Sequence, residues 1–399
     1  MGGSGLYGSV GVTIGAGRAV WLQAEDADSL RRVMLISRIK ESALVTKSYL
    51  LRQRWSQPRD LPCVVIFTSQ IHTGSAGDLR ARAIGRELRR MGWRAIVVPP
   101  QLALRARERL IADEHPDVIF LQQSWHPLNR PGFYPGIPCV FDADDANFHD
   151  SPELVAECCG RSRATIAGSH YIADFFRRHN PDVTVIWTGT YLLPSPKMIP
   201  NAQRSPVITW AQSDPSGFPE EAAFVREVIL RLSGKAKFSF YLYGVRDYAA
   251  AQEYLAPIRA AGVDTQLIMF MRYRNFGRSL EEAAIGLQPV CCAYSRGKNF
   301  GKLLAYMVSG VAAVAANAFE YPFFFRHGQN GMLAADVDEW VGCCRFLLDN
   351  PEERGQIANQ AYLDFQSRLT TRRAAELVSE VLHRVVGDSR HTDGQARLP

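Results

Sequence analysis

The amino-acid sequence predicts an α/β protein of two Rossmann-like domains, each a doubly wound parallel sheet, with a cleft between them. The chain has 399 residues, whereas a single hydrophobic core usually stops growing at about 250–300 residues. Short apolar runs alternate with amphipathic stretches, which is the order of parallel strands connected by helices. Residues 191–206 contain four prolines and no apolar periodicity, so they are predicted to be the linker.

The first domain is predicted to span residues 61–190. Its strands are expected at 63–67, 95–98, 118–121, 139–141, 164–167 and 184–187. Its helices are expected at 78–91, 104–113, 152–159 and 169–178. Gly74 and Gly77 belong to a turn between the first strand and its helix, and Gly92 ends that helix.

The second domain is predicted to span residues 207–370, and a C-terminal helix and tail follow at 371–399. Its strands are expected at 207–210, 238–243, 266–269, 285–289 and 312–315. Its helices are expected at 219–232, 248–261, 280–284, 300–309 and 338–349, with a long helical segment over 351–386. Ligands bind beyond the carboxyl ends of parallel strands, so the interdomain cleft is the expected site.

Residues 1–60 are predicted to precede both domains, as a flexible leader followed by amphipathic helices over 26–55. Positive charge concentrates here and in the first domain. Residues 30–59 hold eight Arg and Lys against one Glu, and residues 80–109 hold nine Arg against two Glu. Such helices either present an ordinary solvated face or contact an anionic membrane or a phosphorylated acceptor.

The composition is that of a globular protein, with 47% hydrophobic and 22% charged residues. There is no apolar run of the roughly 18 residues that a membrane span needs and no secretory signal pattern. We therefore expect a cytoplasmic protein, with peripheral contact at the inner membrane face as an option. Six of the eight cysteines lie in adjacent pairs without CxxC spacing, so reduced structural cysteines are expected.

The histidines show no metal-binding spacing, and the turn at 74–77 fits neither a P-loop nor a dinucleotide fingerprint. No metal, cofactor or nucleic-acid partner is expected. Arg296, Lys298 and Lys302 instead occupy a strand-to-helix turn, where free backbone amides and basic side chains suit a diphosphate. A nucleoside diphosphate held there would need no metal ion.

This loop and helix carry a resemblance to a known family. The pattern G-K-x-x-x-K-L-L-x-Y-M-x-x-G-V over 297–311, the Tyr-Pro pair at 321–322 and H-G-Q-N-G at 327–331 resemble the GT-B glycosyltransferases of retaining family 4. The stretches 62–94, 164–169, 185–189 and 208–213 are also similar to that family. The resemblance covers about residues 62–370, and its second half is the more specific.

The resemblance implies a nucleotide-sugar donor in the second domain, an acceptor on the first, and hexosyl transfer with retention and without a metal. Lys298 and Lys302 would hold the diphosphate, and Leu303 would line the donor. Gly74 and Gly77 would let the first-domain loop approach the donor. A role in polysaccharide biosynthesis would fit such an enzyme.

The sequence departs from the family at several positions. Gly297 and Ala305 stand where the family usually has two glutamates, and residues 212–217 lack its basic pair. Phe323 follows Pro322, where Pro-Glu is frequent. A subgroup with lysines in place of the glutamates is the most similar. The alternatives are a catalytically silent GT-B scaffold or binding protein, and a GT-B epimerase or phosphorylase.

Carboxylates cluster after a first-domain strand in the run Asp142-Ala-Asp144-Asp145. Such a group can polarise an acceptor hydroxyl or stabilise an oxocarbenium-like transition state, and it could also bind a divalent metal, since hard cations take oxygen ligands. We predict Asp144 and Asp145 to be catalytic and Asp142 to pack or orient the loop; the alternative is a turn with a helix cap.

Trp125 and His126 follow the preceding strand and open toward the same cleft. We predict that they contact the acceptor or the sugar; the alternative is a solvated loop. The resulting hypothesis is a transferase that moves a sugar to a hydroxyl of a glycan or lipid-linked glycan, by same-face attack.

Overall fold

The computed structural model describes residues 10–14, 18–22, 49–50, 52–54, 56–70, 74–212, 215, 217–298 and 300–395. The chain divides into two compact units, Met1–Ser56 and Gln57–Pro399, and the larger one contains both six-stranded sheets. In the smaller unit β1 (Val10–Ile14) pairs antiparallel with β2 (Arg18–Leu22), where the sequence predicts no regular element. Residues 49–50 and 52–54 are helical, and the remainder of the basic helices predicted over 26–55 lies outside the described residues.

The first sheet has six parallel strands in the order β4-β3-β5-β6-β7-β8. The strands are β3 (Cys63–Phe67), β4 (Arg94–Val98), β5 (Val118–Gln122), β6 (Cys139–Ala143), β7 (Ala164–Ala167) and β8 (Val183–Val185). Every residue of β3 to β7 is buried, as expected of parallel strands with helices on both faces. The predicted strands of this domain are found within two residues of their expected ends.

Helices and one π-helix accompany this sheet. They are η2 (Gly77–Ala83), α2 (Ile84–Arg90), α3 (Leu104–Glu114), α4 (Pro152–Gly160) and α5 (His170–Phe176). The sequence predicts one uniform α-helix over 78–91. In the structure its first half is the π-helix η2, with five-residue rather than four-residue hydrogen bonding.

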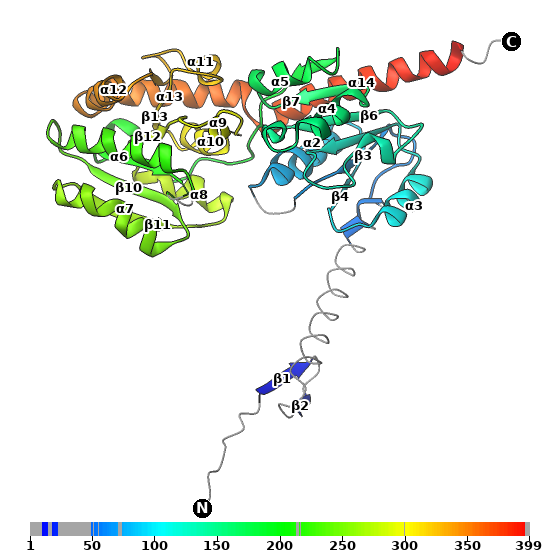
Figure 1. Ribbon diagram of the computed structural model, residues 1–399, viewed down its shortest axis with the longest axis horizontal. Helices are drawn as coiled ribbons and strands as arrows, with labels where there is room; N and C mark the ends of the chain where they lie inside the picture. The colour runs from blue at the N-terminus through cyan, green and yellow to red at the C-terminus, as the bar shows by residue number, and fades with distance from the viewer. Residues whose placement is uncertain are drawn as a thin grey trace, which may run out of the picture. The chain divides into compact units, whose positions relative to one another are not determined.

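The C-terminal helix α14 (Thr371–Gln395) returns to the first domain and covers it (Figure 1). Val378 and Leu382 join Leu88 and Trp93 in one hydrophobic cluster. The Trp93 indole nitrogen donates a hydrogen bond of 2.8 Å to Ser379 Oγ. The end of the chain is therefore part of the first domain's core.

The second sheet has the order β11-β10-β9-β12-β13-β14, again with parallel pairing. The strands are β9 (Val207–Ala211), β10 (Ser239–Val245), β11 (Asp264–Met269), β12 (Ile285–Gln288), β13 (Ala312–Ala316) and β14 (Met332–Ala334). Only the three-residue β14 is missing from the sequence prediction. The strand order reverses between β9 and β12, and ligands of doubly wound sheets bind at such a switch point.

The helices of the second domain are α6 (Pro219–Ser233), α7 (Tyr248–Ala260), α8 (Tyr273–Ser279), α9 (Ala293–Arg296), α10 (Gly301–Val308), α11 (Tyr321–Phe324), α12 (Val337–Asp349) and α13 (Pro351–Arg368). They follow the prediction except at 280–284 and 351–386, and the four-residue helices α9 and α11 were not predicted. The helix predicted at 280–284 is wrong, because the α-helix lies earlier, in α8, and ends in a 3-10 turn at Leu280–Glu282. The long helix predicted over 351–386 is two helices, α13 and α14, separated at residues 369–370.

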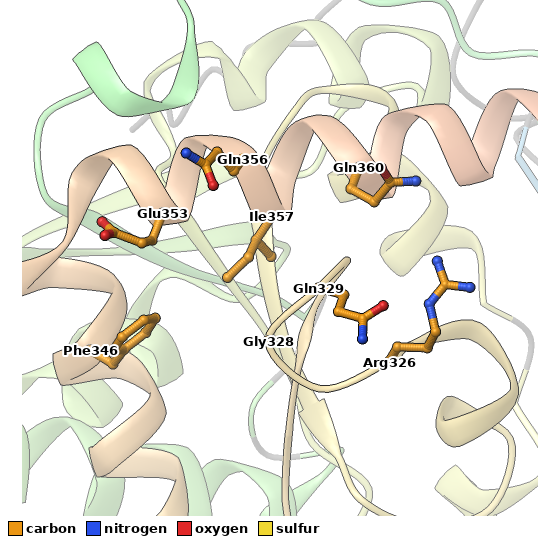
Figure 2. A pocket seen from close by; sticks show the side chains of 8 residues that line it. All are labelled: Arg326, Gly328, Gln329, Phe346, Glu353, Gln356, Ile357 and Gln360. Atoms are coloured by element: carbon orange, nitrogen blue, oxygen red, sulfur yellow. The ribbon is translucent and has the colours of Figure 1, made fainter.

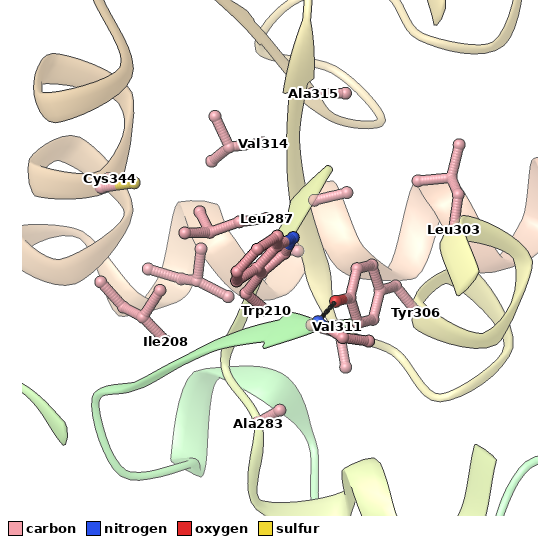
Figure 3. Packing of buried hydrophobic residues seen from close by; sticks show 14 of the residues in the cluster. Ile208, Trp210, Ala283, Leu287, Leu303, Tyr306, Val311, Val314, Ala315 and Cys344 are labelled. Atoms are coloured by element: carbon pink, nitrogen blue, oxygen red, sulfur yellow. Dashed lines mark hydrogen bonds between the residues drawn. The ribbon is translucent and has the colours of Figure 1, made fainter. Parts of the chain in front are cut away.

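The core of the second domain packs α10 against the end of β9 (Figure 3). Tyr306 of α10 is fully buried, and its hydroxyl accepts a 3.0 Å hydrogen bond from the Ala211 backbone N–H. Gly286 makes room for this ring, because a Cβ there would lie 2.7 Å from Tyr306 Cδ2. The basic loop before α10 is thereby held at the switch point of the sheet.

The chain crosses between the domains where Gly189 and Thr190 meet the α13–α14 junction. Thr190 forms a bridge with Thr370, and a Cβ on Gly189 would lie 2.4 Å from the Thr370 carbonyl oxygen. Within the described part of the chain, no helix combines the length and apolarity that crossing a bilayer requires.

Candidate active site

A cavity of about 420 Å³ lies at the carboxyl ends of β9, β10 and β11, and both domains line it. Gly74 and Ser75 come from the first domain. The second domain contributes Ala211, Gln212, Tyr243, Gly244, Arg246, Phe270, Met271, Tyr273, Phe276, Gly301 and Lys302. The cavity occupies the position that the strand order predicts for a ligand.

Lys302, like Gly74, is a predicted donor-binding residue that lines this cavity. It lies in the first turn of α10, and its Nζ donates a 2.5 Å hydrogen bond to the neutral amide oxygen of Gln212. Desolvation by burial, together with the neighbouring charge of Lys298, lowers the pKa of Lys302 to about 7, although Glu221 acts in the opposite direction. An anion bound in the cavity would favour the charged ammonium.

Lys298 points to the same place as Lys302. Their Nζ atoms lie 5.4 and 5.8 Å from the centroid of the Phe218 ring. Arg296 does not join them, because its guanidinium stacks on Phe319 at 4.9 Å. The structure therefore brings together two of the three predicted cations.

Leu303, predicted to line the donor, has no exposed surface and packs in the second-domain core (Figure 3). That prediction is corrected: α10 turns Leu303 inward, so its contribution is to hold the helix in place.

The basic loop contacts the acidic cluster of the first domain directly. The Ala146 backbone N–H donates a 2.9 Å hydrogen bond to the Gly297 carbonyl oxygen. A Cβ on Gly297 would lie 2.1 Å from the Ala146 Cβ, a separation that real side chains do not reach. Gly297 is the position where the related family usually has a glutamate. Here the first domain occupies that space.

Asp142 is fully buried and forms an ion pair with Arg80 of η2. Desolvation raises the pKa of Asp142 to about 6, and Arg80 opposes that shift. Arg80 also donates to the Ile186 carbonyl oxygen at 2.8 Å and lies 3.3 Å from Thr188 Oγ1. Asp142 therefore packs and orients, as the sequence predicts.

Asp144 and Asp145 differ in their accessibility. Asp144 is buried, and its two carboxylate oxygens accept hydrogen bonds from Gln123 Nε2 at 3.0 Å and Thr188 Oγ1 at 2.9 Å. Asp145 is half-buried, directly before Ala146 and the basic loop. Of the two carboxylates, Asp145 is therefore the more accessible.

The two predicted loop glycines are both required by close packing. Gly74 has φ of +79°, and a Cβ there would lie 2.3 Å from the Tyr273 Cβ. A Cβ on Gly77 would lie 2.1 Å from the Gln70 carbonyl oxygen. Gly74 lines the cavity, whereas Gly77 shapes the loop behind it.

Trp125 and His126 differ in exposure and in contacts. The Trp125 side chain is 44% exposed. His126 is turned into the first domain, where its Nδ1 accepts from the Leu128 N–H at 3.1 Å and lies 3.3 Å from Arg107 Nη2. Desolvation and the charge of Arg107 lower the pKa of His126. Its contacts are those of a residue that stabilises the loop.

Sequence reasoning missed the wall of the cavity formed after β10 and β11. The Arg246 guanidinium lies 4.0 Å from the centroid of the Phe270 ring. The Tyr273 hydroxyl lies 3.0 Å from Thr190 Oγ1 and 3.1 Å from the Gly301 carbonyl oxygen. The sequence holds one indication of this wall, since Arg246 and Phe270 closely follow the carboxyl ends of predicted strands.

A second interdomain contact centres on Glu320, which is buried at the start of α11. Its carboxylate accepts hydrogen bonds from the His170 backbone N–H at 2.9 Å and from Trp187 Nε1 at 2.5 Å, and lies 2.8 Å from His170 Nδ1. The Phe323 ring stacks on His170 at 4.1 Å. This contact holds the two domains together beside the site.

A hollow of about 430 Å³ elsewhere in the second domain is close to the cleft cavity in volume (Figure 2). It lies between the Arg326–Gln329 loop, Phe346 of α12 and Gln356 of α13. The described residues that line it include none of the predicted site residues, and Arg326 is already paired with Asp364 at 3.4 Å. Position at the strand ends, rather than volume, singles out the interdomain cavity.

Comparison with known proteins agrees with this architecture. Residues 224–379 match a family model described as glycosyl transferase-like. The sucrose-phosphate synthase of Thermosynechococcus elongatus, 10% identical, superposes with a TM-score of 0.64 over 82% of this chain and 100% of that chain. A glycosyltransferase of Rickettsia africae, 9% identical, gives 0.63 over 82% and 99%. Anabaena HepE in complex with UDP and glucose, 13% identical, gives 0.60 over 81% and 99%.

The chain has the GT-B glycosyltransferase fold. The two parallel sheets confirm the fold class that the sequence predicts. The match to the glycosyl transferase-like family model, which covers most of the second domain, agrees with the predicted transferase activity. At these identities the likeness to the solved structures concerns the fold. No curated protein sequence is a significant match.

Proposed function

We propose that this GT-B protein transfers a sugar from a nucleoside-diphosphate sugar to an acceptor hydroxyl. The observation that carries the proposal is Lys302, which lines the cavity at the switch point and, among the described residues, has the neutral amide of Gln212 as its hydrogen-bond partner. A half-buried ammonium whose pKa is lowered to about 7 gains a further counter-charge when a diphosphate binds. The solved structures of HepE with UDP and with UDP-glucose support the same class of ligand for this fold.

The donor is proposed to lie along the second domain. Its base would occupy the part of the cavity bounded by Arg246 and Phe270, where a guanidinium stacked on an aromatic ring offers a flat surface. Its diphosphate would lie at Lys298 and Lys302, beside the start of α10. These two ammonium groups stabilise the charge that develops on the leaving diphosphate, in the role that a divalent cation has in other transferases.

The acceptor is proposed to approach from the first domain, beside Asp145 and with Trp125 as an exposed aromatic surface. The acceptor oxygen forms a bond to the anomeric carbon while the bond from that carbon to the diphosphate oxygen breaks with its electron pair. The departing oxygen takes the proton of the hydroxyl on the same face, so the configuration is retained. Asp145 stabilises the positive charge on the sugar during this exchange.

We propose that the acceptor binds to the first domain, residues 61–190, and the donor to the second, residues 207–370. The linker at 191–206 joins the two domains. The acceptor class proposed is a glycan or a lipid-linked glycan, in the cytoplasm and at the inner membrane face. The basic stretch 30–59, with eight arginines and lysines against one glutamate, supports this placement, since positive charge favours an anionic surface.

Thermal unfolding with a panel of nucleoside diphosphates and nucleotide sugars tests the proposal. A ligand at one hundred times its dissociation constant adds about 2.7 kcal/mol to the stability. We expect one nucleotide to stabilise the wild type but not Lys302→Ala. The control is Lys235→Ala, which changes an exposed lysine outside the cavity lining and should be stabilised like the wild type. Equal stabilisation of Lys302→Ala would contradict the proposed diphosphate site.

A catalytically silent GT-B binding protein is the second candidate, and one observation favours it. Gly297 and Ala305 replace the glutamates of the related family, and Ala305 is fully buried in α10. Turnover separates the two candidates: hydrolysis or transfer of the donor that stabilises the protein supports the enzyme. Donor binding without turnover over a broad acceptor panel supports the binding protein.

A further inference from the structure

A second cavity, of about 510 Å³, lies at the junction of the domains and has an unusual lining. Four arginines line it against one glutamate. Arg86 and Arg90 belong to α2 of the first domain, and Arg274 and Arg278 belong to α8 of the second. The Tyr191–Leu193 segment, which connects the domains, passes between them.

Among the described residues that line this cavity, positive charges outnumber negative ones. Arg90 is paired with Glu87 at 2.5 Å, and Arg86 lies 5.5 Å from the centroid of the Tyr191 ring. Arg274 and Arg278 are exposed and make no hydrogen bond or ion pair with another described residue. Like charges one helical turn apart destabilise a helix slightly, and an anion bound in the cavity would relieve this repulsion in both helices.

We infer that this cavity binds a phosphate group of a second ligand, distinct from the donor. Guanidinium groups match phosphate oxygens with two parallel hydrogen bonds each, which is why arginine dominates phosphate recognition. The Tyr191 ring and Leu193, whose side chain is 74% exposed, add an apolar edge to the same cavity. The ligand class is therefore a phosphate joined to a less polar part, as in a sugar phosphate or a phospholipid headgroup.

The cavity is linked to the donor site through described contacts. The Tyr191 hydroxyl donates a 2.5 Å hydrogen bond to Asp78 Oδ2, which also accepts from the Gly74 N–H at 2.8 Å. Gly74 lines the donor cavity, and so does Tyr273, which precedes Arg274 in α8. A phosphate that joins α2 to α8 would stabilise the arrangement in which Gly74 packs on Tyr273.

Binding at the two sites should consequently be coupled, and the coupling is reciprocal. The phosphate ligand is expected to raise the affinity for the donor nucleotide several-fold. The expected effect on donor affinity rests on the proposed function, whereas the inference of a phosphate site does not.

The test uses full-length Lys302→Ala protein, so that phosphate cannot act through the donor lysine. Three probes are compared: inorganic phosphate, glucose 6-phosphate, and phosphatidylglycerol vesicles with phosphatidylcholine vesicles as the reference. The site is removed with Arg274→Gln and Arg278→Gln. The matched control is Arg105→Gln with Arg109→Gln, an exposed pair with the same spacing on α3.

We expect at least one phosphate probe to bind Lys302→Ala protein and its Arg105/Arg109 control equally, and to bind the Arg274/Arg278 variant at least tenfold more weakly. Arg86→Gln should weaken the same probe from the other domain. Binding of the soluble phosphates identifies a small-molecule ligand, and binding of phosphatidylglycerol vesicles alone identifies a lipid headgroup. Unchanged binding in the Arg274/Arg278 variant, or no binding of any probe, overturns the inference. Neither result bears on nucleotide binding by the wild type, so the proposed function stands or falls separately.

Discussion

The acidic cluster of the first domain and the basic loop of the second meet at one backbone contact, yet they are stabilised differently. Asp142 has a buried cationic partner in Arg80, and both oxygens of Asp144 accept hydrogen bonds. Lys302 has a neutral amide partner and a lowered pKa. The acidic wall, Asp142 and Asp144, thus has its partners within the protein, whereas a bound anion would supply a counter-charge to the basic wall, Lys298 and Lys302. This difference supports the proposal that the donor phosphates bind to the second domain.

The strongest test of this contrast removes Arg80. Arg80→Ala leaves Asp142 buried without its partner, which costs about 3–5 kcal/mol of unfolding free energy. Arg82→Ala is the control, because its pair with Asp78 is long, at 3.6 Å, and partly exposed, so a change within about 0.5 kcal/mol is expected. Urea denaturation gives both values. A small effect of Arg80→Ala would mean that the acidic wall does not depend on the pair.

The two predicted catalytic carboxylates can be separated by amide substitution. Asp145→Asn is expected to lower kcat about 100-fold with unchanged stability, since electrostatic stabilisation by one carboxylate has this size. Asp144→Asn is expected to lower stability by about 1–3 kcal/mol, because an amide NH₂ would then face a hydrogen-bond donor. Steady-state kinetics with urea denaturation distinguishes them. The reverse assignment would be supported if Asp144→Asn kept its stability and lost turnover.

Gly297 tests the contact between the two walls. Gly297→Ala forces a methyl group against Ala146 and is expected to cost about 1–3 kcal/mol, either as stability or as weaker nucleotide binding. Gly234→Ala is the matched control, since a Cβ there meets nothing within 4 Å. Melting temperatures with and without the stabilising nucleotide report both quantities. Identical behaviour of the two variants would show that the domains are not in contact at Gly297.

Much of the fold was predictable because parallel strands buried on both faces are continuous apolar runs, as in 63–67 and 207–211. The π-helix η2, the break between α13 and α14 and the short β14 were not, since each depends on tertiary contacts rather than on periodicity. In the site, the chain order placed Lys298 and Lys302 beside a strand end, which is where they are found. It could not place Arg246 or Phe270, because their part in the cavity arises from the order of β9, β10 and β11 in the sheet.

Sequence spacing also could not separate Asp144 from Asp145, or Leu303 from Lys302. Neighbouring residues on a loop or helix face in different directions, and only packing decides which of them reaches a ligand. His126 shows the same limit, since its partner Arg107 lies in α3, nineteen positions earlier in the chain.

The most direct test of the account is the pH dependence of nucleotide affinity in wild type, Lys302→Arg and Lys302→Ala. Below pH 7 Lys302 is protonated in the free protein and matches the diphosphate; above pH 7 the free protein has lost that proton and must regain it on binding. The wild-type affinity should therefore fall by up to about tenfold per pH unit above pH 7, relative to Lys302→Arg, whose charge does not titrate. This ratio removes the nucleotide's own titration. Lys302→Ala should bind weakly throughout. Parallel pH profiles for wild type and Lys302→Arg, with Lys302→Ala binding as tightly as either, would contradict the claim that Lys302 holds the donor diphosphate.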